Sequence, residues 1–278
     1  MSEPTLTRSP VPGPHRSDPR PPRAAPRPRS RAVETAVVIG RCIRLTRRDV
    51  DSMVMALALP VMIMLLFVYL FGGAISTGTA YVTYVVPGVM LLCVGFGAAS
   101  TAVSVSRDLS GGIAHRLRAM DVHPAALVNG QVMASLVRNA VATGLVLLVA
   151  LLIGFRPHAD ALRWLAAGGL LALGVLALSW ISATFGVAVR SPEAASGFTF
   201  FLSFLTYPSS AFVPIATMPH WLQGFARNQP VTHLVEALRG LLLDRPVGTH
   251  AAWAAGWSLA LVAVSVAAAT VLYRRRAC

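Results

Sequence analysis

The sequence is poor in charge and contains no lysine. Only 13 % of its 278 residues are charged, against about 25 % in ordinary soluble domains. With 55 % hydrophobic residues and a mean hydropathy of +0.64, a water-soluble fold would expose large apolar patches and aggregate. In a bilayer, apolar surface faces outward at no cost. The composition therefore predicts an integral membrane protein and argues against a soluble enzyme.

Nucleotide-binding and catalytic motifs are absent as well. There is no GxxxxGKS or GxxxxGKT loop to hold nucleotide phosphates, and no HExxH or GxSxG motif of the common hydrolases. The three cysteines show no pairing pattern and no metal-ligand spacing. His233 and Glu236 have the spacing of two metal ligands on one helix, but without a third ligand we expect helix capping or interfacial polar contacts instead. We predict no metal and no cofactor bound by this chain.

Positive charge is concentrated near the N-terminus. The net charge is +13, and eleven of the 24 arginines precede residue 52. Residues 1–31 are rich in proline and arginine and poor in large apolar side chains, which predicts a disordered cytoplasmic tail rather than a signal peptide. An RNA-binding arm is an alternative, but charge that orients the protein in the membrane is the favoured interpretation. No nucleic-acid partner is therefore predicted.

Residues 32–50 have the pattern of an amphipathic helix that precedes a membrane span. Ala36, Ile39 and Ile43 share an apolar face. The basic residues that cluster on another face are Arg41, Arg44 and Arg48. A basic amphipathic helix of this kind lies along the anionic inner leaflet, so membrane lipids are expected contacts.

Uncharged apolar runs predict an all-α membrane domain over residues 32–278. A crossing needs about 20 apolar residues, and residues 52–106 carry no charge, which is enough for two spans. The six predicted spans lie near 52–71, 81–106, 139–156, 164–189, 194–214 and 251–273. No predicted span has a charge in its interior. The chain therefore lacks the buried ionisable relays of ion-coupled carriers.

The arginine distribution predicts the orientation. With both termini in the cytoplasm, 19 of the 24 arginines lie on the cytoplasmic side, as the positive-inside rule requires. Aromatic residues then fall at the outer interface, where they are expected as anchors: Tyr69, Tyr81, Tyr84, Trp164, Trp253 and Trp257.

Two connections are longer than a turn. The cytoplasmic loop 107–138 has apolar residues at helical spacing between Gly111–Gly112 and Pro124, which predicts a short helix on the membrane surface. The outer segment 215–250 has two apolar stripes separated by Asn228–Gln229–Pro230. This pattern predicts a pair of amphipathic helices that dip into the outer leaflet.

Two stretches resemble a known family. FLTYPSSAFVPIATMPHWLQGFARNQPVTHLVEALRGLLL at 204–243 is similar to the pattern of the type 2 ABC exporter permeases, particularly the daunorubicin-resistance-like branch, with Gln229 inserted between its Asn and Pro. RDLSGGIAHRLRAMDVHP at 107–124 is similar to the family's Arg, Gly-rich turn, Leu-Arg and Pro series, with His115 where members often carry an acidic residue. The resemblance covers residues 35–273.

The resemblance implies a role for each segment. The 107–138 loop would carry the coupling helix that docks on a separate ATPase, through Arg107, Gly111, Gly112, Arg116, Leu117, Met120 and Pro124. Residues 32–50 would be the connecting helix. The outer segment would form re-entrant helices that close the exit, with Pro214, Met218, Pro219, Trp221, Asn228, Pro230 and Arg239. Family members pair two permeases with two ATPases, which use ATP and magnesium, and their substrates are often hydrophobic or amphipathic.

The sequence is therefore interpreted as the permease subunit of an ATP-driven exporter in the bacterial plasma membrane, a homodimer or a heterodimer working by alternating access. Alternatives are an ATP-independent carrier or channel and a membrane-embedded enzyme. Missing intramembrane ionisable residues count against a carrier, missing charged rings against an ion channel, and missing catalytic motifs against an enzyme. Within the family, export of a lipid-linked glycan or bacteriocin immunity is also open. Generic apolar side chains leave the substrate unspecified.

Overall fold

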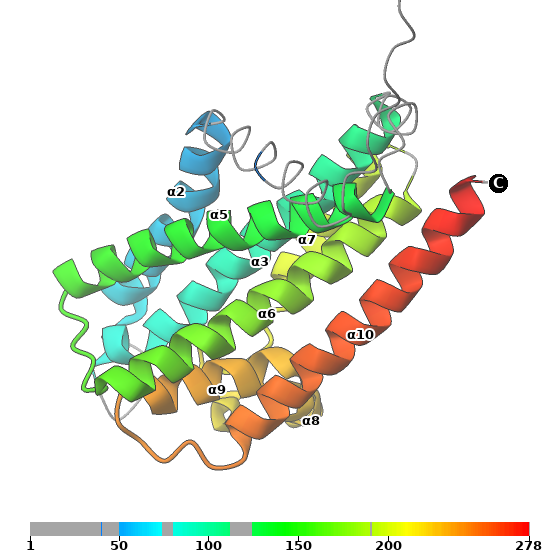
Figure 1. Cartoon of the computed structure of the whole chain (residues 1–278). Helices are drawn as coiled ribbons and strands as arrows, with labels where there is room; N and C mark the ends of the chain where they lie inside the picture. The colour runs from blue at the N-terminus through cyan, green and yellow to red at the C-terminus, as the bar shows by residue number, and fades with distance from the viewer. Residues whose placement is uncertain (1–39, 41–49, 74–79, 112–123, 190, 278) are drawn as a thin grey trace, which may run out of the picture.

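The computed structural model describes residues 40, 50–73, 80–111, 124–189 and 191–277, and these residues form helices and loops with no strand. The helices are α2 (Val50–Leu66), the π-helix η1 (Phe67–Phe71), α3 (Tyr81–Ser110), α5 (Pro124–Leu152), α6 (Ala161–Ala188), α7 (Pro192–Phe204), the 3-10 helix η2 (Ile215–Thr217), α8 (His220–Asn228), α9 (Pro230–Leu242) and α10 (His250–Ala277). Figure 1 shows them as a bundle, with α8 and α9 at one end. We refer to that end as the α9 end and to the other as the Ser110 end.

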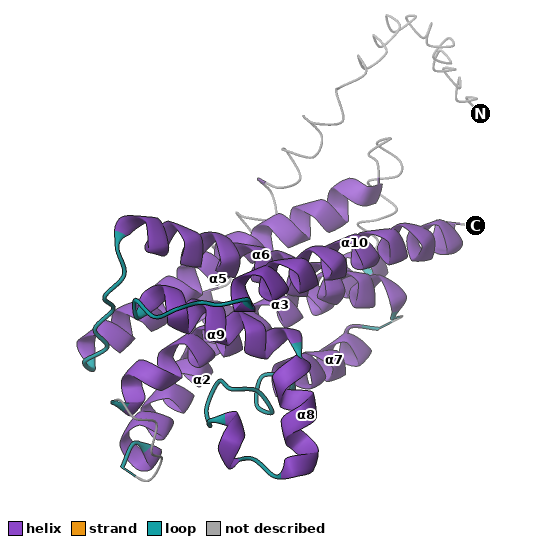
Figure 2. Cartoon of the chain, turned by 90° about the horizontal axis from the view of Figure 1, so that it is seen from below, coloured by secondary structure: helices purple, strands orange, loops and turns teal. Residues whose placement is uncertain are grey.

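The central helix is α3, which is buried along most of its length. Helices α2, α5, α6, α7 and α9 all pack against it, and α10 lies on the far side of α6 (Figures 1 and 2). Close approach of α3 and α6 depends on Gly186, because a Cβ built there would lie 2.5 Å from the carbonyl oxygen of Ala102. On the other face of α6, Thr184 donates a hydrogen bond of 2.9 Å to the carbonyl of Ser265 in α10.

The outer surface of the bundle is apolar. Large side chains on α5, α6 and α10 point away from the core, including Leu152, which is 79 % exposed, and Leu165, which is 74 % exposed. Water would make such a surface aggregate, whereas lipid solvates it. Helices α3, α5, α6 and α10 are also long and apolar enough to cross a membrane. The predicted all-α membrane protein is confirmed at this level.

Local sequence sets the helix ends. Gly154 has a φ of 104° and ends α5, and the N–H of Phe155 behind it binds the carbonyl of Ala150 at 2.9 Å, as in a Schellman motif. The Asp160 carboxylate accepts the backbone N–H of Arg163 at 2.8 Å and caps α6. Pro230 occupies the first position of α9, where its missing N–H costs no hydrogen bond.

One of the six predicted spans corresponds to a shorter helix. The first span is matched by α2 and η1, which follow each other from Val50 to Phe71, whereas in the fifth span α7 has only 13 residues. The predicted fifth span continues to residue 214, but the chain turns after Phe204, and Pro208 in this turn region supplies no backbone N–H. The six-span count and the orientation stay predictions.

The third span differs most from its prediction. Helix α5 begins at Pro124, not near 139, so Arg138 lies within a helix. The helix that contains the predicted third span therefore carries a charged side chain directly before that span. Arg138 is accommodated because its guanidinium donates hydrogen bonds to the carbonyl of Gly97 at 2.9 Å and to the hydroxyl of Thr101 at 3.2 Å on α3. A side chain held in this way ties α5 to α3.

The α3–α6 contact gives a testable prediction. Gly186→Val should lower the free energy of unfolding by about 1–3 kcal/mol, because its methyl groups collide with the Ala102 carbonyl and overpack the contact. Gly256→Val on α10 is the matched control, since nothing lies within 4 Å of a Cβ at that glycine. The measurement is unfolding of the purified protein in detergent, titrated with sodium dodecyl sulfate. Equal stability of the two variants would contradict the close approach.

Candidate functional site

Most residues predicted to contact an ATPase lie outside the described part of the chain. These are Arg41, Arg44, Arg48, Gly112, Arg116, Leu117 and Met120. The described ones lie at the two edges of the 112–123 gap: Arg107 and Gly111 at the end of α3, and Pro124 at the start of α5. Arg107 is exposed, and its carbonyl accepts the N–H of Gly111 at 2.8 Å.

At the Ser110 end, next to the 112–123 segment, a side-chain contact holds α3 and α5 together. The amide of Gln131 on α5 donates a 2.6 Å hydrogen bond to the Asp108 carboxylate on α3. Together with the two bonds of Arg138, this contact makes α3 and α5 one unit at the Ser110 end. A force applied to the 112–123 segment would therefore reach α3 and α5 together.

At the α9 end, the predicted pair of amphipathic helices is observed as α8 and α9. The predicted residues before α8 (Pro214, Met218 and Pro219) surround η2 and the α8 start. Trp221 on α8 is 80 % exposed, and its partner on the same helix, Phe225, is half exposed. An apolar exposed face on a short helix suits a lipid surface. The apolar face of α9 is instead buried against α3, α6 and α10.

The junction of the two short helices carries the inserted residue. Asn228 ends α8, with its amide donating to the carbonyl of Gly224 at 2.9 Å, and Pro230 starts α9. Gln229 between them is buried, and its amide nitrogen donates to the carbonyl of Pro208 at 2.5 Å. The insertion thus fastens the α8–α9 junction to the turn that follows α7.

Arg239 on α9 is the centre of the α9 end. It is 5 % exposed, and its guanidinium binds groups from three segments. Nη1 donates to the Glu236 carboxylate at 2.6 Å, and Nη2 donates to the carbonyls of Ser210 at 2.9 Å and Tyr84 at 3.1 Å. The guanidinium carbon also lies 3.8 Å from the centroid of the Tyr84 ring, a cation–π contact. Burial of this charge is tolerated because every side of it is paired.

The two tyrosines at the start of α3 complete this cluster. The Tyr81 hydroxyl donates to the carbonyl of Phe212 at 2.8 Å, and the Tyr84 hydroxyl donates to that of Ser210 at 3.0 Å. The 206–213 segment lies close to α3 because Gly88 has no side chain, and a Cβ there would lie 2.5 Å from the Ala211 carbonyl oxygen. Tyr81 and Tyr84 were predicted as lipid anchors, but both are buried, since their hydroxyls satisfy carbonyls of this irregular segment.

The side chains of His233 and Glu236 contact different partners. Glu236 pairs with Arg239, and Nδ1 of His233 lies 3.0 Å from Nδ1 of His250 at the start of α10. Burial, and then the neighbouring His250, hold the pKa of His233 below its ordinary value. Among the described residues no three His, Cys, Asp or Glu side chains gather as a metal site. The contact of His233 with His250 is a polar contact between α9 and α10, whereas the Glu236–Arg239 ion pair lies within α9.

The sequence did not predict that Tyr84, Ser210 and Glu236 are the groups that bind Arg239. One signal was available: Glu236 and Arg239 stand three residues apart on an otherwise apolar helix, which is the spacing of an ion pair. The arrangement offers no nucleophile with an activating base. Its chemistry is that of a clamp that joins α9, α3 and the 206–213 segment.

These features define a class: a polytopic helical membrane protein with paired short helices clamped at one end. Comparison with family models places residues 33–243 in the ABC-2 type transporter family. The chain belongs to this family. It is similar to the daunorubicin resistance ABC transporter permease protein DrrB1 of Streptomyces coeruleorubidus, with 31 % identity over 78 % of each chain.

Two further relatives come from Mycobacterium tuberculosis. The probable doxorubicin resistance ABC transporter permease protein DrrC is 24 % identical over 87 % of this chain and 88 % of its own length. The doxorubicin resistance ABC transporter permease protein DrrB is 26 % identical over 74 % of each chain. The resemblance to type 2 permeases and the multi-pass bacterial membrane location are confirmed.

The clamp gives a second prediction. Arg239→Gln should lower the free energy of unfolding by about 3–5 kcal/mol, because it leaves the Glu236 carboxylate without its charged partner and removes the bonds of the guanidinium to the Ser210 and Tyr84 carbonyls. Arg227→Gln on α8 is the control, since Arg227 is exposed, and it should change stability by less than about 0.5 kcal/mol. Unfolding in detergent measures both. Equal effects would show that the buried guanidinium does not hold the α9 end.

Proposed function

We propose that the chain is the permease subunit of an ATP-driven exporter and that it exports a hydrophobic or amphipathic compound, such as an anthracycline antibiotic. The observation that carries this proposal is that three permeases named for daunorubicin or doxorubicin resistance align over roughly three quarters or more of the chain. The apolar bundle favours the same substrate class, because it offers few groups to bind a charged hydrophilic solute.

Energy for export would come from a separate ABC ATPase that binds ATP and magnesium. The chain has no P-loop, and the charged side chains inside α3 and α5 do not form a relay: Arg138 is bonded to the α3 backbone and to Thr101. A proton or sodium gradient thus has no evident entry point. Two permeases, as a homodimer or with a homologous permease, would enclose the translocation path.

The proposed topology has six spans with both termini in the cytoplasm. The first span would be formed by α2 and η1, and the fifth by α7 with the segment that follows it. The arginine count supports this orientation, because 19 of 24 arginines then lie inside. The Ser110 end of the bundle would face the cytoplasm, and the α9 end would face outward, with α8 and α9 as the re-entrant helices that close the exit.

Helix α3 would transmit the movement. It has 30 residues and is about 45 Å long at about 1.5 Å per residue. One end borders the 112–123 segment, where the coupling helix is expected, and the other end carries Tyr81 and Tyr84 in the Arg239 clamp. A tilt imposed by the ATPase at the cytoplasmic end would therefore move α9 and the 206–213 segment with α3. Such rigid-body motion is a common form of alternating access.

The coupling proposal predicts the effect of two substitutions. Leu117→Asp should abolish most ATP-dependent export and co-purification of the ATPase, since burying a large apolar side chain contributes roughly 1.5–3 kcal/mol to docking. Arg116→Glu should weaken both if the rim of the ATPase groove is acidic. The measurement is efflux of daunorubicin from proteoliposomes, with ATP or with a proton or sodium gradient. Gradient-driven efflux by the chain alone would favour a secondary carrier.

The matched control is Leu148→Asp, which places the same charge on an exposed face of α5, away from the 112–123 segment. It should affect membrane insertion rather than ATPase binding. Wild-type co-purification and wild-type export by Leu117→Asp would move the coupling site off this loop.

The orientation predicts which cysteines are accessible. In a variant without native cysteines, Ser76→Cys should react with a membrane-impermeant maleimide in intact cells, because residues 72–80 would lie outside. Ser110→Cys, at the exposed end of α3, should react only after lysis. Labelling of Ser110→Cys in intact cells would reverse the orientation.

A further inference from the structure

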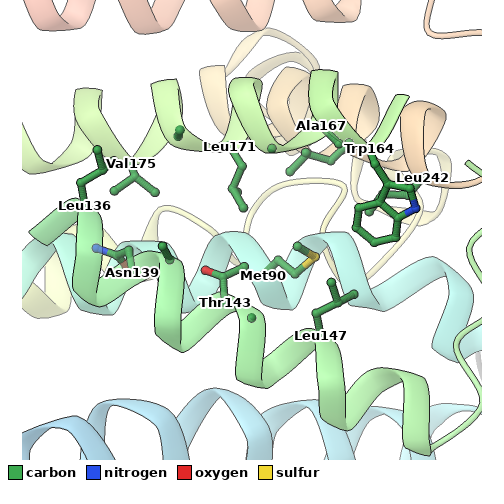
Figure 3. Close-up of a pocket in the computed structure, with 15 residues that line it drawn as sticks. Met90, Leu136, Asn139, Thr143, Leu147, Trp164, Ala167, Leu171, Val175 and Leu242 are labelled. Carbon is green, nitrogen blue, oxygen red and sulfur yellow. The ribbon is translucent and has the colours of Figure 1, made fainter. Parts of the chain in front are cut away.

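A cavity of about 430 Å³ lies between α5 and α6. Met90 of α3 and Leu242 of α9 contribute to its lining, so four helices line it, and it opens to the surface of the bundle at the exposed residues Gly144 and Gly168 (Figure 3). Its volume falls within the range of about 300–1,000 Å³ that small-molecule sites occupy. The lining is apolar except for Asn139 and Thr143. A space of this composition is fitted to a largely apolar molecule.

The cavity exists because α5 and α6 stand apart where small residues would let them touch. The helices are in contact where the hydroxyls of Ser135 and Ser179 lie 2.9 Å apart. Nearer the α9 end, Gly144 and Gly168 line the cavity from opposite sides. Facing small residues usually bring membrane helices into close contact. Here nothing lies within 4 Å of a Cβ at either glycine, so the two glycines border open space.

The polar residues of the cavity are not fully paired. Thr143 is 4 % exposed, points from α5 toward the space between the helices in Figure 3, and its hydroxyl has no hydrogen-bond partner among the described residues. Asn139 donates to the carbonyl of Ser135 at 3.0 Å, but its carbonyl oxygen also lacks a partner in the same part of the chain. A buried hydroxyl without a partner costs about 1–3 kcal/mol. A ligand group that bonds to Thr143 would remove this cost.

The opposite end of the cavity carries an aromatic ring. Trp164, near the start of α6, lies beside Leu242 in Figure 3, away from Asn139. Its neighbour Arg163 forms a 2.7 Å ion pair with Asp244, which links the start of α6 to the end of α9. The indole face and the Thr143 hydroxyl are therefore held at separate points of one apolar space. Such a site suits a molecule in which one part is an aromatic ring that contacts the indole, and another part carries a group that forms a hydrogen bond with the hydroxyl.

We propose that the α5–α6 cavity is a binding site, within a single protomer, for a hydrophobic ring compound that carries a hydrogen-bonding group for Thr143. The inference rests on the proposed function, because it names a site for the exported compound. A phospholipid acyl chain is the other apolar molecule available in a membrane. It has no group that can bond to the Thr143 hydroxyl, and it gains nothing particular from the Trp164 ring, so the ring compound is favoured.

The test is equilibrium binding of tritiated daunorubicin to the full chain in lipid nanodiscs, with empty nanodiscs subtracted. Gly168→Leu should weaken saturable binding at least tenfold, since its side chain fills the cavity without a clash. Gly169→Leu is the matched control. Gly169 is next to Gly168 and also has open space around it, but it does not line the cavity, so binding should change less than twofold. Thr143→Val should weaken binding about three- to tenfold, and Thr143→Ser should restore it.

Equal affinity in Gly168→Leu and Gly169→Leu, or no saturable binding to the wild type, would overturn the site. Phospholipid that stays bound to the wild type through delipidation, and is lost only from Gly168→Leu, would instead assign the cavity to an acyl chain. The assay needs no ATPase, so it separates the two proposals. ATP-dependent export that survives in Gly168→Leu rejects the cavity alone, whereas cavity binding without export by the assembled transporter rejects the proposed function.

Discussion

The buried guanidinium of Arg239 determines how the α9 end of this permease is built. A charge that is only 5 % exposed persists in an apolar bundle when each of its donors has an acceptor, and here the acceptors come from α9, from α3 and from the 206–213 segment. An irregular segment packed in an apolar bundle has carbonyls without helical N–H partners, and apolar surroundings cannot supply donors for them. Arg239, Tyr81 and Tyr84 supply those missing donors.

Because α3 takes part in the Arg239 clamp at one end and is bonded to α5 at the other, this single helix connects the two ends of the molecule. The same helix is bonded to α5 at the Ser110 end through Asp108 and Gln131, and through Arg138 further along. Helix α6 lies against α3 at Gly186 with no room for a side chain. Such contacts favour rigid-body movement over bending. The α5–α6 pair is different: its helices are bonded through Ser135 and Ser179, and they separate toward the α9 end to leave the cavity between them.

The sequence predicted the candidate site in outline only. The spacing of apolar residues identified Trp221, the Asn228–Pro230 break and the two amphipathic helices that are found as α8 and α9, and the family resemblance implied Arg239. The sequence did not predict that Tyr81 and Tyr84 are buried, because an aromatic residue near a span end satisfies the pattern of a lipid anchor equally well. Nor did it place Arg138 within α5, since one charge interrupts a hydropathy run without interrupting a helix.

What the sequence by itself determined is the class of the protein: low charge and long apolar runs fix an all-helical membrane bundle, because only lipid solvates such a surface. Local signals also determined several helix starts and ends, such as Gly154 and Pro230. Only the tertiary structure decided which partners the buried polar groups have, since these partners are up to 155 residues apart in the chain. It also decided which glycines are packed and which border open space, because that difference lies in the neighbouring helix and not in the glycine.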